Sequence, residues 1–315
     1  MHTLTRYSVT CPRACLTVFS NALCPYPGGL PVSTPSENAF SRLVSTAWLA
    51  EHLDDPKVRV IEVSSAIEDT AYREGHVPGA AWWYWKAALW HPTDREFATS
   101  EAMAQRLEVL GVTPDTTIVL YGRPVQFGTY AFWTLSMCGH RDVRMLDGGI
   151  ARWRAEGRPL SAETPIFTPA AYAPTPRDES SRMGRDDVRA GLGRPGRLLL
   201  DVRTPEEYSG QRVTGPGGFD HGAERAGRIP GAVHLFFREL LNEDDTFKDP
   251  QTLRRLLAGV GIRDPRQDVV VYCRLSHRAT LAWFAMRYLL GYQDVKVYDG
   301  SWTEWGSIVG FPVER

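Results

Sequence analysis

Short apolar runs alternate with amphipathic segments along the C-terminal half of the chain. Runs at 198–202, 269–272 and 295–298 are nearly continuous in Val, Leu and Tyr, which is typical of parallel strands covered on both faces. Residues 250–260 repeat Leu and Val at helical spacing, so an amphipathic helix is predicted there. The same reasoning predicts a strand at 232–235 and helices at 205–208 and 279–290.

The N-terminal half repeats the landmarks of this pattern at a nearly constant distance along the chain. HVPGA at 76–80 corresponds to RIPGA at 228–232, and LDGGIARW at 146–153 corresponds to YDGSWTEW at 298–305. VIEV at 60–63 matches LLDV at 199–202 at a smaller offset, so the second copy contains an insertion. The glycine-rich stretch 211–225 accounts for it and is predicted to be a surface loop. Such a repeat predicts two similar domains.

We therefore expect an α/β protein with two tandem domains, each a mainly parallel sheet flanked by helices. The N-terminal domain is predicted to span 41–163 and the C-terminal domain 183–315. The proline-rich stretch 164–182 is interpreted as the linker. Residues 1–40 are interpreted as a leader, either a disordered or a targeting segment, because the first 36 residues contain neither Asp nor Glu.

Charge and cysteine content narrow the function classes. A net charge of −1 gives no electrostatic basis for binding nucleic acid, and no apolar run is long enough to span a membrane. Cys11, Cys15 and Cys24 lie near the start of the chain, and Cys138 and Cys273 are isolated. This spacing predicts neither a disulfide framework nor a metal site, so we expect a cytoplasmic, reducing setting. Helical spacing among apolar neighbours predicts that Cys138 belongs to the core.

Cys273 is the candidate nucleophile. It follows the apolar run 269–272 and precedes a predicted helix, where successive backbone N–H groups can converge on an anion. Arg274, Arg278 and His277 would add positive charge, which lowers a thiol pKa. The alternative is a buried structural cysteine, and the flanking arginines favour the nucleophile.

The first copy lacks this chemistry. Its strand 117–121 aligns with 269–272, and Gly122 stands where the second copy has Cys273. Pro124 also removes one backbone donor from the loop 122–128. We predict that the N-terminal domain is catalytically inactive and has a structural role, which could include one wall of the site. The aromatic run 82–85 could contribute to such a wall, although ordinary core burial is favoured.

Four motifs together resemble the two-domain rhodaneses, a sulfurtransferase family. They are HVPGA with its copy RIPGA, DVRTPEEY at 201–208, VYCRLSHR at 271–278 and YDGSWTEWG at 298–306, within a resemblance over about residues 42–311. The resemblance implies two rhodanese-like domains with the active site between them. It also implies a persulfide on Cys273, with no metal or organic cofactor.

The implied reaction moves a sulfane sulfur from thiosulfate to cyanide, to another thiophilic acceptor or to a protein thiol. The six-residue loop from Cys273 to Arg278 resembles the sulfur-handling members, since related phosphatases have a longer loop. Arg274 resembles the thiosulfate-using branch. Leu275 and Glu207 depart from it, because vertebrate-type enzymes have basic residues at both places. Two alternatives follow, 3-mercaptopyruvate as the donor, or a sulfur carrier that delivers the persulfide to a partner protein.

The loop residues Arg274, Ser276, His277 and Arg278 are the predicted substrate-binding group. A dianionic donor suits the guanidinium of Arg274. The hydroxyl of Ser276 is expected either to donate to the persulfide or to cap the following helix.

Three residues are predicted to support the loop. Asp201 could brace it, and Arg203 could pair with Asp201 or Glu206, in a structural or a substrate role. Trp302 could line the pocket, whereas Trp305 is expected to be a packing residue.

Overall fold

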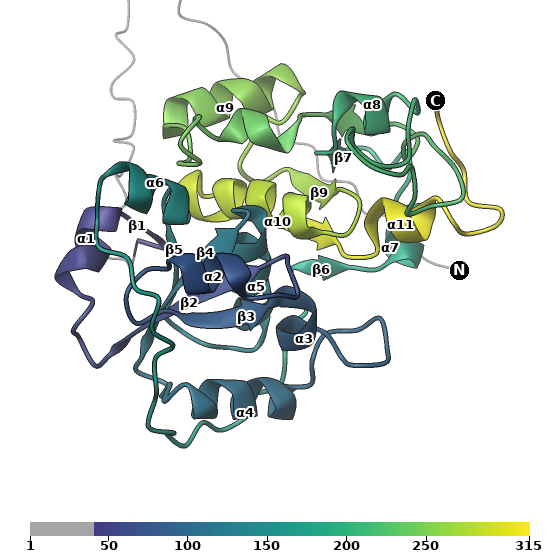
Figure 1. The fold of residues 1–315 in the computed structure, drawn as a ribbon. Helices are drawn as coiled ribbons and strands as arrows, with labels where there is room; N and C mark the ends of the chain where they lie inside the picture. Colours follow the sequence, from purple (N-terminus) through teal and green to yellow (C-terminus); the bar gives the residue numbers. More distant parts are fainter. Residues whose placement is uncertain (1–40) are drawn as a thin grey trace, which may run out of the picture. The chain divides into compact units, whose positions relative to one another are not determined.

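The computed structural model describes residues 41–315, which belong to one compact unit (Figure 1). Our interpretation of residues 1–40 as a leader, and the cysteines in it, lie outside the described residues. The described chain contains two five-stranded sheets, in the orders β1-β5-β4-β2-β3 and β6-β10-β9-β7-β8, and the paired strands are parallel. The two orders correspond strand for strand, which confirms the predicted pair of α/β domains.

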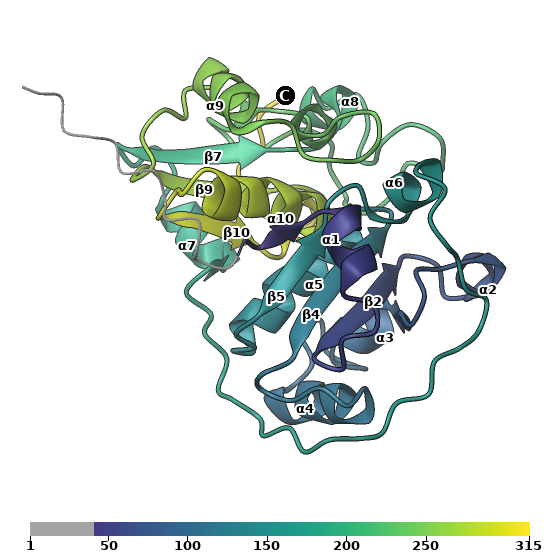
Figure 2. The same cartoon turned by 90° about the vertical axis from the view of Figure 1, so that its left-hand side faces the viewer.

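The first domain follows a strand–helix alternation from the start of the described chain. Its strands are β1 (Leu43–Val44), β2 (Val58–Ser64), β3 (Ala81–Tyr84), β4 (Thr117–Arg123) and β5 (Val143–Leu146). Its helices are α1 (Thr46–Glu51), α2 (Thr70–Glu74), α3 (Trp85–Leu89), α4 (Ser100–Val109), α5 (Gln126–Met137) and α6 (Gly149–Ala155). Figure 2 shows β5, β4 and β2 running side by side, with β4 in the centre.

The second domain repeats this alternation. Its strands are β6 (Arg182–Met183), β7 (Arg197–Asp201), β8 (Val233–His234), β9 (Asp268–Tyr272) and β10 (Val295–Tyr298). Its helical segments are α7 (Arg185–Ala190), α8 (Pro205–Tyr208), η1 (Phe237–Leu240), α9 (Pro250–Gly259), α10 (His277–Phe284), η2 (Ala285–Leu289) and α11 (Ser301–Trp305). The central strand β9 is buried from Val269 to Tyr272, as expected for a strand covered on both faces.

Local sequence explains the strongest of these elements. Asp249 caps α9 by accepting the N–H groups of Gln251 and Thr252, and Pro250 occupies the first helical position, where its missing N–H is not needed. In α8, the Thr204 side chain accepts the N–H of Glu207, whose carboxylate accepts the Thr204 N–H. This capping box makes a four-residue helix possible and fixes the orientation of Glu207.

Three predicted boundaries differ from the structure. The helix expected at 279–290 begins at His277, ends as α-helix at Phe284 and continues as a π-helical turn. The strand expected at 232–235 is reduced to Val233–His234, although the Leu235 N–H still donates to the carbonyl of Asp201 in β7 (3.0 Å). The stretch 164–179 forms neither helix nor strand, whereas the last residue of the predicted linker already belongs to β6.

The segment after α6 runs along the first domain rather than crossing freely to the second (Figure 2). The Ala170 N–H donates to the carbonyl of Glu108 in α4, and the Arg59 guanidinium lies 4.4 Å from the ring centre of Phe167. These two contacts anchor the proline-rich stretch to the domain that it leaves.

The two domains share one hydrophobic core across the α5–α10 contact. Phe132 of α5 meets Phe284 of α10 edge to face, with ring centres 4.9 Å apart. Cys138 is buried in this core, which confirms its predicted packing role, and burial raises its pKa to about 11. The interface is thus largely apolar, consistent with a fixed arrangement of the two domains.

Candidate active site

Cys273 lies where the central strand β9 ends, at the carboxyl edge of the second sheet. Its side chain is buried but lines a cavity of about 260 Å³. Both domains contribute to the lining, which consists of Trp85, Gln126, Phe127, Thr214, Gly215, Cys273, Arg274, Leu275, His277 and Arg278. The wall that we expected from the first domain is therefore present, with Trp85 the member of the aromatic run that reaches it.

The loop after β9 is held by the first turn of α11. The N–H of Trp302 donates to the carbonyl of Cys273 (2.9 Å), and the N–H of Thr303 donates to the carbonyl of Arg274 (3.1 Å). The Cys273 N–H donates to the Ser301 hydroxyl (3.2 Å). The first two of these hydrogen bonds direct the loop carbonyls to α11. Their oxygen atoms therefore do not repel an anion bound near the sulfur.

Arg278 forms a bidentate ion pair with Glu207, at 2.6 and 2.9 Å. Burial opposes the charge of Arg278, but the hydrogen bonds from Glu207 and the nearby Cys273 and Glu207 charges hold its pKa above its ordinary value. Burial likewise opposes ionisation of Glu207, and the Arg278 hydrogen bond and charge outweigh it, so its pKa is lowered. Glu207 therefore does not replace a substrate-binding arginine. It holds Arg278 beside the cavity.

Arg274 connects the loop to the insertion between α8 and β8. Its Nη1 donates to the Thr214 hydroxyl (2.8 Å), and Thr214 and Gly215 form part of the cavity wall. The insertion, which we predicted only as a surface loop, thus positions one of the predicted substrate-binding residues.

His277 has a different character from the one that we predicted. It packs among Trp85, Phe127 and Tyr130, with ring centres 4.3 to 4.5 Å away. Burial, followed by the charges of Arg95, Arg278 and Arg274, lowers its pKa well below the ordinary value. A neutral imidazole lies in the wall, so His277 does not add positive charge.

The hydroxyl of Ser276 is directed away from the cavity. It donates to the main-chain carbonyl of Asp299 and lies 2.9 Å from the Asp299 Oδ1 atom. Ser276 occupies the N-cap position of α10 but makes no side-chain cap, and its φ of 71° is left-handed. Neither of the two roles that we predicted for this hydroxyl matches its contacts.

Asp201, Arg203 and Trp302 form a fully buried support behind the loop. Arg203 pairs with Asp201 at 2.6 Å, which decides between its two predicted partners, and its guanidinium lies 4.5 Å from the Trp302 ring centre. Trp302 donates from Nε1 to the carbonyl of Arg225 and is not among the residues that line the Cys273 cavity. It is a packing residue, like the buried Trp305.

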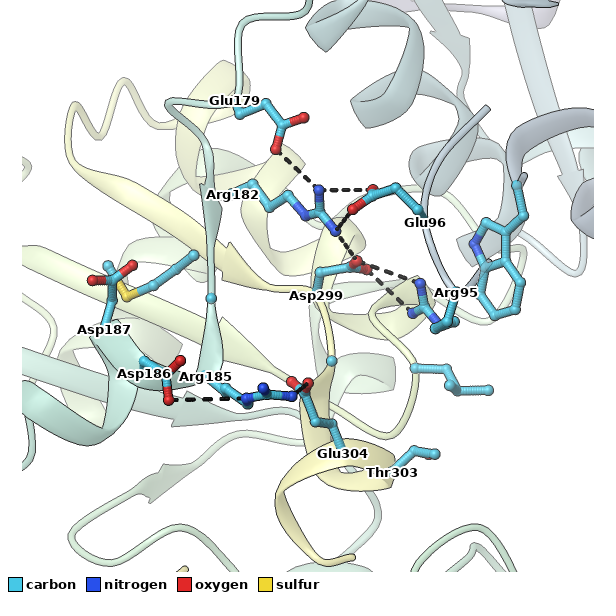
Figure 3. A pocket seen from close by; sticks show the side chains of 15 residues that line it. Arg95, Glu96, Glu179, Arg182, Arg185, Asp186, Asp187, Asp299, Thr303 and Glu304 are labelled. Carbon is cyan, nitrogen blue, oxygen red and sulfur yellow. Dashed lines mark hydrogen bonds and ion pairs between the residues drawn. The ribbon is translucent and has the colours of Figure 1, made fainter. Parts of the chain in front are cut away.

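A second cavity, of about 940 Å³, is also lined by residues of both domains (Figure 3). Leu275 lines both cavities. In the second cavity, the carboxylate of Asp299 forms ion pairs with the guanidinium groups of Arg182 (3.0 Å) and Arg95 (3.4 Å). Arg182 also pairs with the carboxylate of Glu96 at 2.8 Å. Charged groups of the two domains therefore meet directly behind the loop.

The corresponding loop of the first domain has no room for a nucleophile. A Cβ atom added to Gly122 would lie 2.3 Å from the Gly128 nitrogen and 2.5 Å from the Pro124 carbonyl oxygen. Its buried carboxylate has a different partner from that of the second domain. Glu62 aligns with Asp201 but pairs with Arg123, at 2.9 and 3.0 Å, and Arg123 aligns with Arg274 rather than with Arg203.

Sequence reasoning missed Asp299, Thr214 and the pair Gln126–Phe127. Asp299 belongs to a repeated Asp-Gly motif, and Thr214 belongs to the insertion that separates the copies, so both had a signal in the repeat. Gln126 and Phe127 belong to the first-domain loop 122–128, the silent loop that has no cysteine, and their contribution depends on how the domains pack.

The described residues 41–315 thus form two matching α/β domains, and the second of them has a cysteine in the loop that lines the cavity. The rhodanese-like domain model matches residues 45–156 and 184–308. The chain therefore belongs to the rhodanese family.

Relatives of known name agree with this family. The chain is 46% identical over 281 residues to "Sulfur carrier protein TtuD" of Thermus thermophilus, covering 87% of this chain and 96% of the relative. It is 39% identical over 286 residues to "Putative thiosulfate sulfurtransferase" of Haloferax volcanii, covering 89% and 98%. These names associate the family with sulfur transfer.

Solved structures show the same fold. The anaerobic ergothioneine biosynthesis enzyme from Chlorobium limicola, solved with trimethyl histidine, is 27% identical, with a TM-score of 0.77 over 87% of this chain and 70% of that chain. A structure of EanB with a cysteine persulfide and ergothioneine is 26% identical, with the same TM-score and the same two coverages.

Residues 41–315 contain neither a membrane-spanning helix nor a cluster of metal ligands. Within this range, no helix has the length and apolar character to cross a membrane. No group of three or more potential metal ligands occurs there either.

Proposed function

We propose that this protein is a sulfurtransferase that carries a sulfane sulfur as a persulfide on Cys273, with thiosulfate as the donor and cyanide or a thiol as the acceptor. The single observation that supports this most is the position of Cys273, in a cavity at the end of β9 with Arg274 and Arg278 in its wall. A thiolate and its persulfide are both anions, and these guanidiniums would stabilise them.

The proposed reaction has two half-reactions. The Cys273 thiolate attacks the outer sulfur of thiosulfate, the sulfur–sulfur bond of thiosulfate breaks, and sulfite leaves with the bonding electrons. Cyanide then attacks the outer sulfur of the persulfide, which forms thiocyanate and returns the Cys273 thiolate. Covalent catalysis of this kind divides one transfer into two steps and leads to ping-pong kinetics.

Arg274 and Arg278 are proposed to have separate roles. Arg278, held by Glu207, supplies a fixed charge beside the sulfur. Arg274 makes one hydrogen bond, to Thr214, and has further N–H groups for the sulfonate-like end of thiosulfate. Arg274→Gln is expected to raise the KM for thiosulfate about tenfold with a smaller change in kcat, since it removes binding that both ground and transition states share.

The domain roles are part of the same proposal. We assign residues 41–163 to an inactive N-terminal domain, 164–182 to the linker and 183–315 to the catalytic domain. The contacts around Gly122, which exclude a side chain from the silent loop, support the inactive role. The cytoplasmic setting stays a proposal, supported by two buried free thiols, Cys138 and Cys273.

A second candidate is a sulfur carrier that delivers the persulfide to a partner protein. The name of the Thermus thermophilus relative favours it, at 46% identity over nearly the whole of that protein. A carrier would form the Cys273 persulfide as readily as an enzyme, but would release it slowly to small acceptors.

The test compares thiosulfate with 3-mercaptopyruvate as donors at equal concentrations. Mass spectrometry follows the added sulfur on Cys273, and thiocyanate formation follows turnover with cyanide. We expect loading by thiosulfate, turnover with cyanide and loss of both in Cys273→Ala. Loading without turnover would favour the carrier, and preferential loading by 3-mercaptopyruvate would change the donor. Full activity of Cys273→Ala would refute the proposed site.

A further inference from the structure

Asp299 is the point where the loop of Cys273 meets the first domain. It follows β10 and is only 4% exposed. Its Oδ1 and main-chain carbonyl accept the Ser276 hydroxyl from one side. Arg182 and Arg95 bind its carboxylate from the other side (Figure 3). A carboxylate this buried is stable only because charged partners surround it.

Arg95 belongs to the first domain and is itself held in place. Its guanidinium lies 3.9 Å from the Trp90 ring centre, and the indole Nε1 of Trp90 donates to the Tyr130 hydroxyl (2.7 Å) in α5. Ser276 is thus connected through Asp299 and Arg95 to the core of the other domain.

The first domain offers an internal comparison. Asp147 occupies the same place in the repeated Asp-Gly motif, and its carboxylate accepts the N–H of Phe247 (2.9 Å) in the second domain. Both aspartates therefore fasten the domains together. The silent loop has Val125 where the second copy has Ser276, so there is no hydroxyl for Asp147 to hold. Of these two aspartates, only Asp299 binds a hydroxyl of the loop next to it.

We propose that Asp299 is a positioning residue, which fixes the persulfide loop through Ser276 and makes its geometry depend on contact with Arg95 of the first domain. The inference rests on the proposed function, in which Cys273 is the reacting thiol. Ser276 has a left-handed backbone, an unfavourable conformation for a residue with a side chain, so the surrounding contacts must hold it there. The hydroxyl contact to Asp299 is such a contact, three residues after the sulfur.

The experiment compares Asp299→Asn with Asp147→Asn, which removes the matching charge from the silent copy. Asparagine keeps both acceptors for Ser276 but loses the ion pairs to Arg95 and Arg182, so residue 299 and the loop that it holds should shift. We expect Asp299→Asn to lower kcat about tenfold with little change in the KM for thiosulfate, because a small displacement of catalytic groups acts mainly on the transition state. The alkylation rate of Cys273 by iodoacetamide should fall by a similar factor. Asp147→Asn should leave kcat and the alkylation rate within about twofold of the wild-type values. This should hold even if it lowers the melting temperature as much as Asp299→Asn does.

Ser276→Gly tests the same connection without removing an interface charge. Glycine accepts the left-handed backbone, so this variant is expected to fold. It should reproduce the fall in kcat, and its combination with Asp299→Asn should lose little more, since both act through one contact. Equal effects of Asp299→Asn and Asp147→Asn, or additive losses in the double variant, would overturn the inference. Alkylation is measured without a sulfur donor, so it tests Asp299 even where the proposed sulfur transfer fails.

Discussion

The hydroxyl oxygens of Thr129 and Thr280 lie 3.1 Å apart at the centre of the domain interface. Thr129 lies on α5 and Thr280 on α10, at matching positions of the two copies, and both are fully buried. Each hydroxyl also lies near a carbonyl of its own helix, Gln126 for Thr129 and His277 for Thr280. The repeat is therefore visible in three dimensions as a pairing of equivalent residues, and this pair lies one turn beyond the loop residues of the site.

This pairing predicts a measurable coupling between the two hydroxyls. Thr129→Val and Thr280→Val each keep the side-chain shape but remove one partner, so each should lower the free energy of unfolding by about 1 kcal/mol. Thr129→Val/Thr280→Val should cost about 1 kcal/mol less than the sum of the two, because the contact between the hydroxyls is lost in each single variant and is counted twice in that sum. Urea denaturation of the four proteins measures this. Strict additivity would contradict the hydrogen bond.

Glu207→Gln is expected to be strongly destabilising. The Glu207 carboxylate is fully buried and neutralises Arg278, whose side chain is 16% exposed. Removing one partner of such a pair leaves a buried charge uncompensated, which costs about 3 kcal/mol. Denaturation at pH 7 measures the loss, with Glu206→Gln on the same helix as the control. A loss below about 1 kcal/mol would show that solvent reaches Arg278.

His277 gives the stability a defined pH dependence. Its folded-state pKa is lowered, so the unfolded chain takes up a proton first as the pH falls. The stabilisation from neutral His277 is complete above about pH 6.5 and is lost below it, by up to about 1.4 kcal/mol per pH unit. His277→Phe fits the aromatic surroundings and should remove this slope between pH 6.5 and 5. His221→Phe, at an exposed position, should keep it. Parallel curves for wild type and His277→Phe would contradict the burial of a neutral imidazole.

Much of the fold and the position of Cys273 could be predicted because both follow from local patterns. The run Val269–Tyr272 is a buried strand by composition alone, and a cysteine directly after it must lie at the carboxyl edge of the sheet. The repeat then indicated the silent counterpart, since Gly122 follows the equivalent strand.

The parts that could not be predicted depend on contacts between distant side chains. Ser276 seemed to face the sulfur from sequence, but its hydroxyl is bound by Asp299, 23 residues away. The sequence suggested that His277 is cationic, because it lies between two arginines of the loop. In the structure, Trp85 and Phe127 of the other domain surround it, and this burial favours the neutral ring. The burial of a side chain and its hydrogen-bond partners depend on how the two domains pack. The pattern of residues along the sequence does not contain this information.

The contacts around Gly122 predict that the silent loop cannot be converted to a second active site by restoring the cysteine. Gly122→Cys would place a Cβ atom 2.3 Å from the Gly128 nitrogen and 2.7 Å from the Val125 carbonyl oxygen, both of them backbone atoms. The loop would have to move, and overpacking of this kind costs about 1 to 3 kcal/mol or more. Gly122→Cys combined with Cys273→Ala should therefore form no persulfide with thiosulfate, measured by mass spectrometry.

The matched control for this prediction is Gly259→Ala. Gly259 ends α9 and has no atom within 4 Å of an added Cβ, so alanine should keep or raise the melting temperature. Gly122→Ala should lower it by several degrees, since the same added atom now meets backbone on three sides. If Gly122→Ala is as stable as wild type, or if Gly122→Cys is loaded by thiosulfate, the silent loop is adaptable. The inactivity of the first domain would then come from the lack of a counterpart to Arg278, where the first copy has Phe127, rather than from its packing.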